Sequence, residues 1–111
     1  MQDPEKLKKR SEFQRTYQNG RKYWNRNFVI YVLNTDFNGL RLGITVSNKT
    51  GKSVQRNRVK RLIRESFRQL RPMMKMGYDV VVVGRTPASR LTCQEARNAL
   101  AHLFRKATIL S

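Results

Sequence analysis

A run of basic side chains without any acid is the part of this sequence best suited to chemistry. Between Asp36 and Glu65 the chain has eight Lys and Arg residues and no Asp or Glu. A guanidinium group can bind a phosphate through two parallel hydrogen bonds, and an ammonium group acts as a point charge. The run therefore predicts contact with RNA or DNA. The alternative is an ordinary solvated surface, which would normally mix the two signs of charge so that Glu–Lys pairs form four residues apart on a helix.

The net charge of the whole chain also favours a polyanionic partner. Its 111 residues carry 24 Lys and Arg against 7 Asp and Glu, which gives a formal net charge of +17. Soluble domains typically have a net charge of about 2 to 8 in magnitude, so nucleic acid is the favoured partner and an anionic membrane is the rival. No run approaches the roughly 18 apolar residues of a membrane span. Cys93 is the single cysteine, which excludes a disulfide framework and favours a reducing cytoplasm.

A helix over residues 53–70 has to position the basic run. At 100° per residue its apolar side chains gather on one side, which we expect to dock on a sheet. These are Val59, Leu62, Ile63, Phe67 and Leu70. The opposite side is a polar and cationic face that consists of Asn57, Lys60, Arg61, Arg64 and Arg68. Because like charges four residues apart destabilise an isolated helix, this pattern is best explained by a phosphate-bearing partner.

A shorter helix is expected near the start of the chain. Ser11 begins a Ser-x-x-Gln capping box, and the Asn-Gly pair at 19–20 ends the helix. Phe13 and Tyr17 lie four residues apart and therefore on one face of it. Residues 1–10 are expected to be a loose basic lead-in.

Strands and a last helix complete the predicted domain. A Thr-x-x-Glu capping box at 92–95 begins the last helix. Residues 36–39 are predicted to be a hairpin loop. The order of elements indicates an α+β layer fold, with a single domain over residues 1–111. The expected strands are Arg21–Trp24, Phe28–Asn34, Leu40–Val46 and Tyr78–Gly84.

Catalysis by the protein itself is not expected. A metal-dependent nuclease needs clustered carboxylates or histidines, whereas His102 is the only histidine and Asp36, Glu65 and Asp79 are scattered along the sequence. The Gly-Lys-Ser triplet at 51–53 lacks the first glycine of a phosphate-binding P-loop. We therefore predict no catalytic residue and no metal-binding residue in this chain.

The basic helix resembles the bacterial ribonuclease P protein family. The pattern RNRxKRLIR at residues 56–64 is similar to the characteristic helix of that family. The combination of several motifs in order is highly specific, whereas any one alone would be weak. The other similar segments, which extend the likeness to nearly the whole chain, are Leu7–Lys9, Glu12–Phe13, Phe28–Tyr31, Arg41–Ser47, Tyr78–Asp79 before four valines, and Leu103–Lys106.

The resemblance implies a fold and two RNA-binding surfaces. The implied fold is α+β with the order αβββαβα, a single layer of mostly antiparallel sheet and a left-handed βαβ crossover through the basic helix. One surface would contact the catalytic RNA and consists of Arg56, Asn57, Arg58, Lys60, Arg61, Arg64 and Arg68. The other would be a cleft for the single-stranded 5′ leader of precursor tRNA, lined by Phe13, Tyr17, Tyr31, Lys49, Lys60 and Arg64.

Aromatic rings suit a leader cleft because base stacking tolerates any sequence. From their spacing alone, Phe13 and Tyr17 fit the core as well as a cleft, and the resemblance favours the cleft. Asn48 stands where the family usually has a second Lys beside Lys49, so one phosphate contact stays open. Trp24 fits either stacking or packing.

The resemblance also assigns the chemistry to the RNA. It implies that Mg²⁺ is held mainly by the RNA subunit, with none bound by the protein alone. The protein would then be a cytoplasmic subunit of an endoribonuclease that removes the leader during tRNA processing. The alternatives are a ribosomal-type structural protein, which would share the basic helix but have no leader cleft, and an autonomous nuclease. The oligomeric state of the protein stays open.

Overall fold

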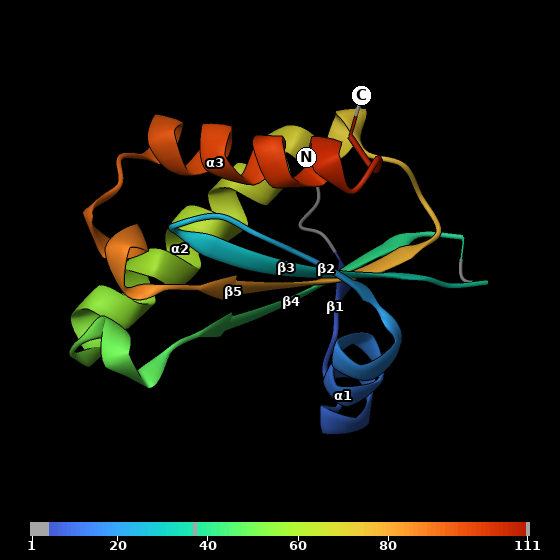
Figure 1. Ribbon diagram of the computed structural model, residues 1–111, viewed down its shortest axis with the longest axis horizontal. Coiled ribbons are helices and arrows are strands. Elements are labelled where there is room, and N and C mark those ends of the chain that lie inside the picture. Colours follow the sequence, from blue (N-terminus) through green and yellow to red (C-terminus); the bar gives the residue numbers. More distant parts are fainter. Residues whose placement is uncertain (1–4, 37, 111) are drawn as a thin grey trace.

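A five-stranded sheet lies between helices on its two faces in the computed structural model, which describes residues 5–36 and 38–110 (Figure 1). The strands are β1 (Glu5–Lys6), β2 (Arg21–Trp24), β3 (Phe28–Asn34), β4 (Leu40–Val46) and β5 (Tyr78–Gly84). The helices are α1 (Arg10–Asn19), α2 (Ser53–Leu70) and α3 (Cys93–Lys106), with short 3₁₀ turns η1 (Asn48–Thr50), η2 (Arg71–Met73) and η3 (Thr86–Arg90). Every strand and helix predicted from the sequence is present, and η1 to η3 and β1 are additional.

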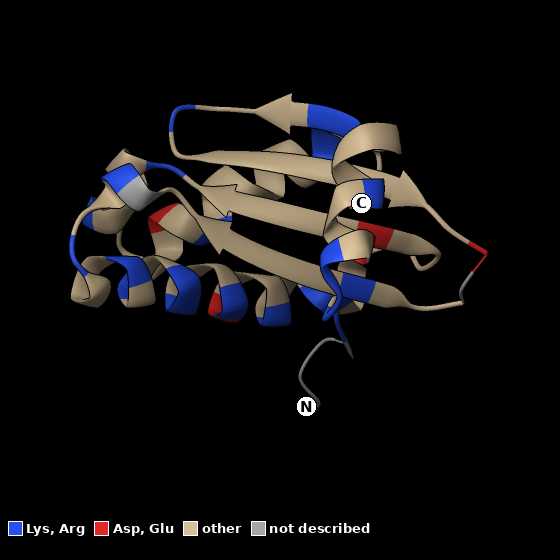
Figure 2. Ribbon diagram, turned by 90° about the horizontal axis from the view of Figure 1, so that it is seen from below, with Lys and Arg blue, Asp and Glu red and all other residues tan. Residues whose placement is uncertain are grey.

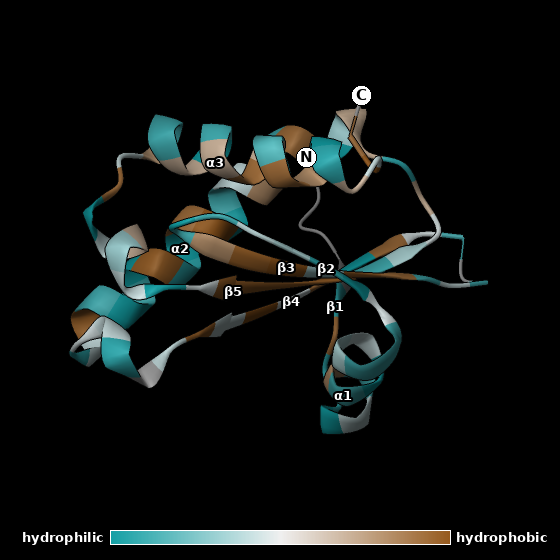
Figure 3. Ribbon diagram, in the orientation of Figure 1, coloured by the Kyte–Doolittle hydropathy of each residue, from teal (hydrophilic) through white to brown (hydrophobic). Residues whose placement is uncertain are grey.

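One face of the sheet is covered by α2 and α3, which lie above it in Figure 1. The predicted apolar side of α2 is confirmed, because each of its members is buried. Figure 3 shows the same pattern, with hydrophobic strands facing the hydrophobic sides of these two helices. The core therefore lies between the sheet and this helix layer. Its largest fully buried side chains include Phe28, Phe67, Phe104, Ile30, Leu40 and Ile63.

The helix ends follow the sequence in part. At α3 the Thr92 side chain accepts a hydrogen bond from the Glu95 amide, which confirms the capping box. Gly20 ends α1 as predicted, and its N–H donates to the Thr16 carbonyl at 2.9 Å. The start of α1 was predicted wrongly, because the helix begins at Arg10 and not at Ser11. The Glu12 carboxylate, not a serine hydroxyl, accepts hydrogen bonds from the backbone amides that precede the helix. An ionised acceptor makes the stronger hydrogen bond with backbone amides.

The sheet has the order β1-β4-β5-β3-β2, which corrects the predicted hairpin. β3 and β4 are joined by residues 35–39 but do not pair, because β5 lies between them. A run of four valines is suited to such a central strand, where both faces are buried. The sheet is mixed, since β5 pairs parallel with β4 and antiparallel with β3. α2 forms the crossover between β4 and β5, and the left-handedness of this crossover stays a prediction.

The lead-in is more ordered than expected. Glu5 and Lys6 pair in parallel with Arg41 and Leu42 of β4, and Leu7 is buried. The expectation of a loose segment is therefore wrong for residues 5–10, while residues 1–4 lie outside the described part. No helix in the described ranges has the length and apolar composition needed to cross a membrane.

The second face of the sheet carries α1 and is only partly covered. Its side chains form three rows across the paired strands, and α1 contacts the first two. The first row is Leu33, Asp79 and Arg41. The second is Lys22, Tyr31, Val81 and Gly43. The third, which we call the open row, is Trp24, Val29, Val83 and Thr45.

Candidate nucleic-acid interface

The polar face of α2 is accessible along its length, as the sequence predicted. Figure 2 shows Lys and Arg at successive turns of this helix. Asn57, Lys60 and Arg61 are exposed and Arg64 is half-buried. Since the apolar side of α2 is fixed to the core, these groups stand on a rigid support. The face can therefore hold several phosphates at fixed spacing.

Three of the predicted RNA-binding residues have partners within the protein. The Arg58 guanidinium donates to the carbonyls of Ser89 at 3.2 Å and Leu91 at 2.8 Å. These two hydrogen bonds connect α2 with η3 and with the residue that follows it. Arg68 forms an ion pair with Glu65 at 3.2 Å.

Arg56 also has a contact within α2. Its guanidinium donates to the Ser53 hydroxyl at 3.5 Å. Together, these contacts mean that Lys60, Arg61 and Arg64 are better placed than Arg58 and Arg68 to meet an external phosphate.

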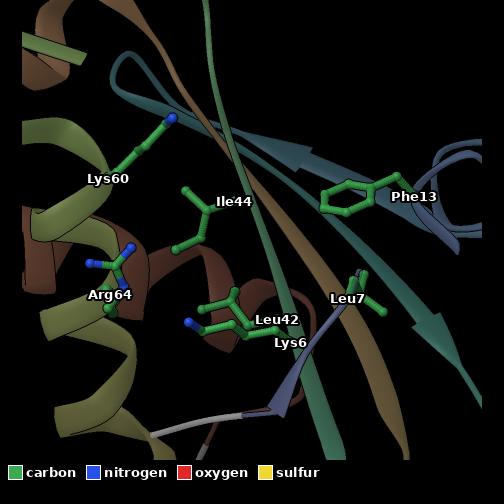
Figure 4. Close-up of a pocket in the computed structure, with 7 residues that line it drawn as sticks. All are labelled: Lys6, Leu7, Phe13, Leu42, Ile44, Lys60 and Arg64. Carbon is green, nitrogen blue, oxygen red and sulfur yellow. The ribbon is translucent and has the colours of Figure 1, made fainter. Parts of the chain in front are cut away.

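A pocket lies at the edge of β4, where β1 has ended (Figure 4). In the figure, Lys60 and Arg64 extend from α2 toward Ile44, and Phe13 lies on the other side of β4. The pocket thus joins the cationic face of α2 to the face of the sheet that carries α1. Its lining residues are Lys6, Leu7, Phe13, Leu42, Ile44, Lys60 and Arg64.

Glycine at position 43 allows α1 to approach the sheet. A Cβ atom there would lie 2.5 Å from Cε1 of Phe13 and 3.2 Å from Cδ1 of Leu7. Real Cβ atoms essentially never make a contact as short as 2.5 Å, so the Phe13 ring packs directly on the backbone of β4. In the sequence of β4, apolar residues alternate with Arg41, Gly43 and Thr45. This alternation is typical of a strand with one accessible face, but it gives no sign that an aromatic ring packs there.

The other two predicted cleft aromatics contact each other. The Tyr17 and Tyr31 ring centroids are 4.8 Å apart with an interplanar angle of 83°, an edge-to-face contact. Both rings are only half-buried. Together with Phe13 they form a line of rings beside the open row. The three rings are therefore neither fully in the core nor fully in a cleft. They pack between α1 and the sheet, and part of each ring stays accessible.

An ion-pair network that sequence reasoning missed fixes α1 to the sheet. The carboxylate of Asp79 is fully buried and accepts hydrogen bonds from Nε and Nη2 of Arg41 at 2.8 and 2.7 Å. Arg15 of α1 lies 3.3 Å from the same carboxylate. Nη1 of Arg41 in turn donates to Glu12 at 2.7 Å. These partners are distant in sequence, so no local pattern linked them.

The network and the helix start also set the ionisation of two groups. Hydrogen bonds to Asp79 raise the pKa of the Arg41 guanidinium, and burial opposes this only in part. The pKa of Glu12 falls from 4.5 to about 2, first because the amides of Lys9 and Lys8 donate to its carboxylate and also because Arg41 lies beside it. Glu12 therefore stays ionised and anchors the start of α1.

Lys49 lies apart from this arrangement. It is exposed in η1, between β4 and α2, and does not line the pocket. The side chain of Asn48 lies outside what the structure describes. The structure thus unites Phe13, Lys60 and Arg64 in one pocket and Tyr17 with Tyr31 in one contact.

Two acidic side chains that a metal site could have used, Asp79 and Glu65, are paired with arginines. Within residues 5–36 and 38–110, no group of three His, Cys, Asp or Glu side chains is arranged to hold a metal ion. The buried carboxylate of Asp79 faces two guanidinium groups, and Glu65 pairs with Arg68.

Comparisons with known proteins agree on one family, whose model, Ribonuclease P, matches residues 1–108. A ribonuclease P protein component from Bacillus pumilus is 44% identical over 110 residues, which are 98% of this chain and 92% of that protein. One from Alkaliphilus metalliredigens is 41% identical over the whole of both chains. The solved RNase P protein of Staphylococcus aureus has a TM-score of 0.86 at 37% identity and covers 96% of this chain and 97% of its own. That of Thermotoga maritima has a TM-score of 0.83 at 32% identity and covers 92% and 96%. The chain therefore belongs to the ribonuclease P protein family.

Proposed function

We propose that this protein, as the protein subunit of ribonuclease P, binds the catalytic RNA through α2 and the 5′ leader of precursor tRNA beside α1. The observation that carries the leader site is the pocket at the edge of β4. It unites Phe13 from α1 with Lys60 and Arg64 from α2. An unpaired strand offers ring faces and phosphates, so an aromatic ring beside two cations suits it.

We assign the catalytic RNA to α2 and the leader to the α1 face because the two surfaces differ in the kind of groups they offer. The exposed cations of α2 stand on a helix that is fixed by its buried side, which suits a folded RNA with phosphates at defined positions. The α1 face instead offers partly exposed rings, which stack on any base and therefore accept leaders of many sequences. Lys60 and Arg64 lie where the two surfaces meet.

The protein would assist a reaction that the RNA performs. Catalytic RNA and precursor tRNA are both polyanions, and a subunit with a net charge of +17 lowers the repulsion between them. Mg²⁺ ions held mainly by the RNA would supply the metal-ion chemistry of phosphodiester hydrolysis. The expected effect of the protein is higher affinity for substrate and a lower requirement for Mg²⁺. The same proposal places the protein in the cytoplasm with its substrates.

Reconstitution with the matching RNA tests this proposal. Cleavage of precursor tRNA at low Mg²⁺ should accelerate when the full chain is added. The Lys60→Ala variant should accelerate cleavage less than wild type. Lys106→Ala removes the same charge from an exposed position on α3 and should behave like wild type. If cleavage at low Mg²⁺ is the same with and without the protein, the proposal is wrong.

Two other outcomes would assign a different role. If the holoenzyme binds precursor tRNA and tRNA without a leader with equal affinity, the protein would be a structural RNA-binding protein. Cleavage that persists without any RNA subunit after stringent purification would identify an autonomous nuclease.

A further inference from the structure

The Trp24 side chain lies outside the hydrophobic core. It is the only tryptophan in the chain and is 60% exposed at the end of β2, an edge strand of the sheet. Tryptophan is large and on average highly buried, so its exposure is informative. Of the two alternatives that the sequence left for Trp24, packing in the core is excluded, because the ring is exposed. Stacking on a partner is the alternative that is left.

The position of Trp24 connects it with the predicted leader cleft. It pairs with Val29 on β3 and lies in the open row, so it is the diagonal neighbour of Tyr31 on the same face. Side chains in that relation have Cα atoms about 7 to 8 Å apart and are within reach of each other when they are aromatic or long. Trp24 therefore continues the line of rings that begins with Phe13 and Tyr17 on α1.

A cation lies between the two rings. The ammonium nitrogen of Lys22 is 5.8 Å from the ring centroid of Trp24 and also 5.8 Å from that of Tyr31. The stretch from residue 13 to 35 contains no acidic residue. A phosphate between two bases stacked on Trp24 and Tyr31 would meet Lys22. Rings spaced around a cation match the alternation of base and phosphate in an unpaired strand.

The order of the strands gives this site a direction. β4 lies near one edge of the sheet, where the polar face of α2 is also found, and β2 is the strand at the opposite edge. A single-stranded RNA that leaves the pocket of Lys60 and Arg64 and follows the open row would pass Thr45, Val83 and Val29. It would then reach Trp24. Trp24 thus lies on the edge strand that is farthest from β4 in the order of the sheet.

We propose that Trp24 and Lys22 form a distal binding site for single-stranded RNA, which extends the leader cleft across the sheet to β2. This inference rests on the proposed function and adds to it a dependence on leader length. A short leader ends before the distal site and gains nothing from it. A longer leader stacks one more base there and binds more tightly.

The test uses the reconstituted holoenzyme and a series of precursor tRNAs whose leaders increase by one nucleotide. Stacking of one base corresponds to a change in dissociation constant of about fivefold to a hundredfold. Trp24→Ala should weaken binding of long leaders by a factor in that range and leave short leaders unchanged. Tyr31→Ala should weaken binding from a shorter leader length onward. Trp24→Phe should restore most of the affinity, because a phenyl ring also stacks.

A matched control separates stacking from general loss of an exposed apolar side chain. Met73 is 51% exposed and lies in η2, on the side of α2 and α3. Met73→Ala should leave the affinity unchanged at every leader length. Thermal unfolding of Trp24→Ala should match that of wild type, which shows that the variant folds.

The single tryptophan also provides a direct signal from the isolated protein. Adding oligouridylate to the full chain should change the fluorescence of Trp24, and the change should saturate and weaken with added salt. Lys22→Ala should require more oligouridylate for the same change. No fluorescence change on saturation with oligouridylate would overturn the proposal.

Two further results would also overturn it. One is a Trp24→Ala variant with wild-type affinity at all leader lengths while Tyr31→Ala loses affinity, which would leave the proposed function intact. The other is a Trp24 fluorescence that changes with protein concentration alone, which would assign the ring to contact between copies of this chain. If no variant and no leader length alters affinity, the proposed function itself fails.

Discussion

On the face of the sheet that α2 and α3 cover, the contacts are mainly apolar, whereas on the other face α1 is held by ion pairs and ring contacts. Ile63 and Phe67 of α2 are fully buried against the sheet and α3. Arg15 and Glu12 of α1 instead reach Asp79 and Arg41. The first face is closed, and the open row of the second face is only partly covered.

The difference shows how one small domain can be both stable and accessible. Apolar burial stabilises in proportion to the area removed from water, so a helix held in that way hides the surface it uses. Ion pairs fix a helix through a few directed contacts and leave its rings partly exposed. We therefore expect variants of the two faces to differ in the property that they change.

The largest expected effect is on the closed face. Phe67→Ala removes a ring that is fully buried and packs edge-to-face on Phe104, and should lower the free energy of unfolding by about 3 to 5 kcal/mol. Urea denaturation followed by circular dichroism measures this change. Val54→Ala, at an exposed position of the same helix, should change it by less than about 0.5 kcal/mol. A loss below about 1 kcal/mol for Phe67→Ala would show that this face is not the stabilising one.

A smaller effect is expected where α1 is anchored. Asp79→Asn keeps the shape of the side chain but leaves Arg41 without its buried ionised partner, and should cost about 2 to 4 kcal/mol. Asp36→Asn changes an exposed acid and serves as the control. Denaturation of both variants under one set of conditions gives the comparison. Equal stabilities for the two variants would mean that the network does not hold α1.

The cations of α2 should differ according to their partners. Lys60→Ala and Arg64→Ala should each reduce the slope of log affinity for RNA against log salt by about 0.7 to 0.9, since each neutralises a phosphate. Arg68→Ala should reduce it less because Glu65 already pairs with that guanidinium. Binding isotherms at several salt concentrations measure the slopes. An equal reduction for all three would remove the distinction between paired and accessible cations.

The smallest expected effect is a pH dependence at the start of α1. The pKa of Glu12 is lowered from 4.5 to about 2 in the folded protein, so its stabilisation is complete above about pH 4.5 and is lost as the pH falls toward 2. The melting temperature of wild type should therefore exceed that of Glu12→Gln at pH 6, and the difference should shrink between pH 4.5 and 2. A difference that stays constant over this range would contradict the role of Glu12.

The sequence predicted what depends on neighbours along the chain. The bounds of β2 to β5 and of α2, the apolar side of α2 and the capping box at Thr92 all follow from local periodicity or short motifs, and all were confirmed. The order of the predicted elements followed from the same local patterns, the resemblance implied the same order, and the structures of related proteins agree with it.

What the sequence did not predict depends on residues that are far apart. The insertion of β5 between β3 and β4 is a choice among strand pairings, and no local pattern distinguishes them. Asp79 meets Arg41 across 38 positions, so it appeared to be an isolated acid. The start of α1 was missed because a serine cap and a glutamate cap are both consistent with the residues present, and the carboxylate makes the stronger contact.

The most direct test of the account compares the affinity of the holoenzyme for precursor tRNA with its affinity for the same tRNA without a leader. In wild type, the leader should increase affinity. In the Phe13→Ala/Tyr17→Ala variant this gain should fall by at least about fivefold, while affinity for the tRNA without a leader stays the same. A variant that keeps the full gain, or that loses affinity for both RNAs equally, would contradict the claim that the α1 face binds the leader.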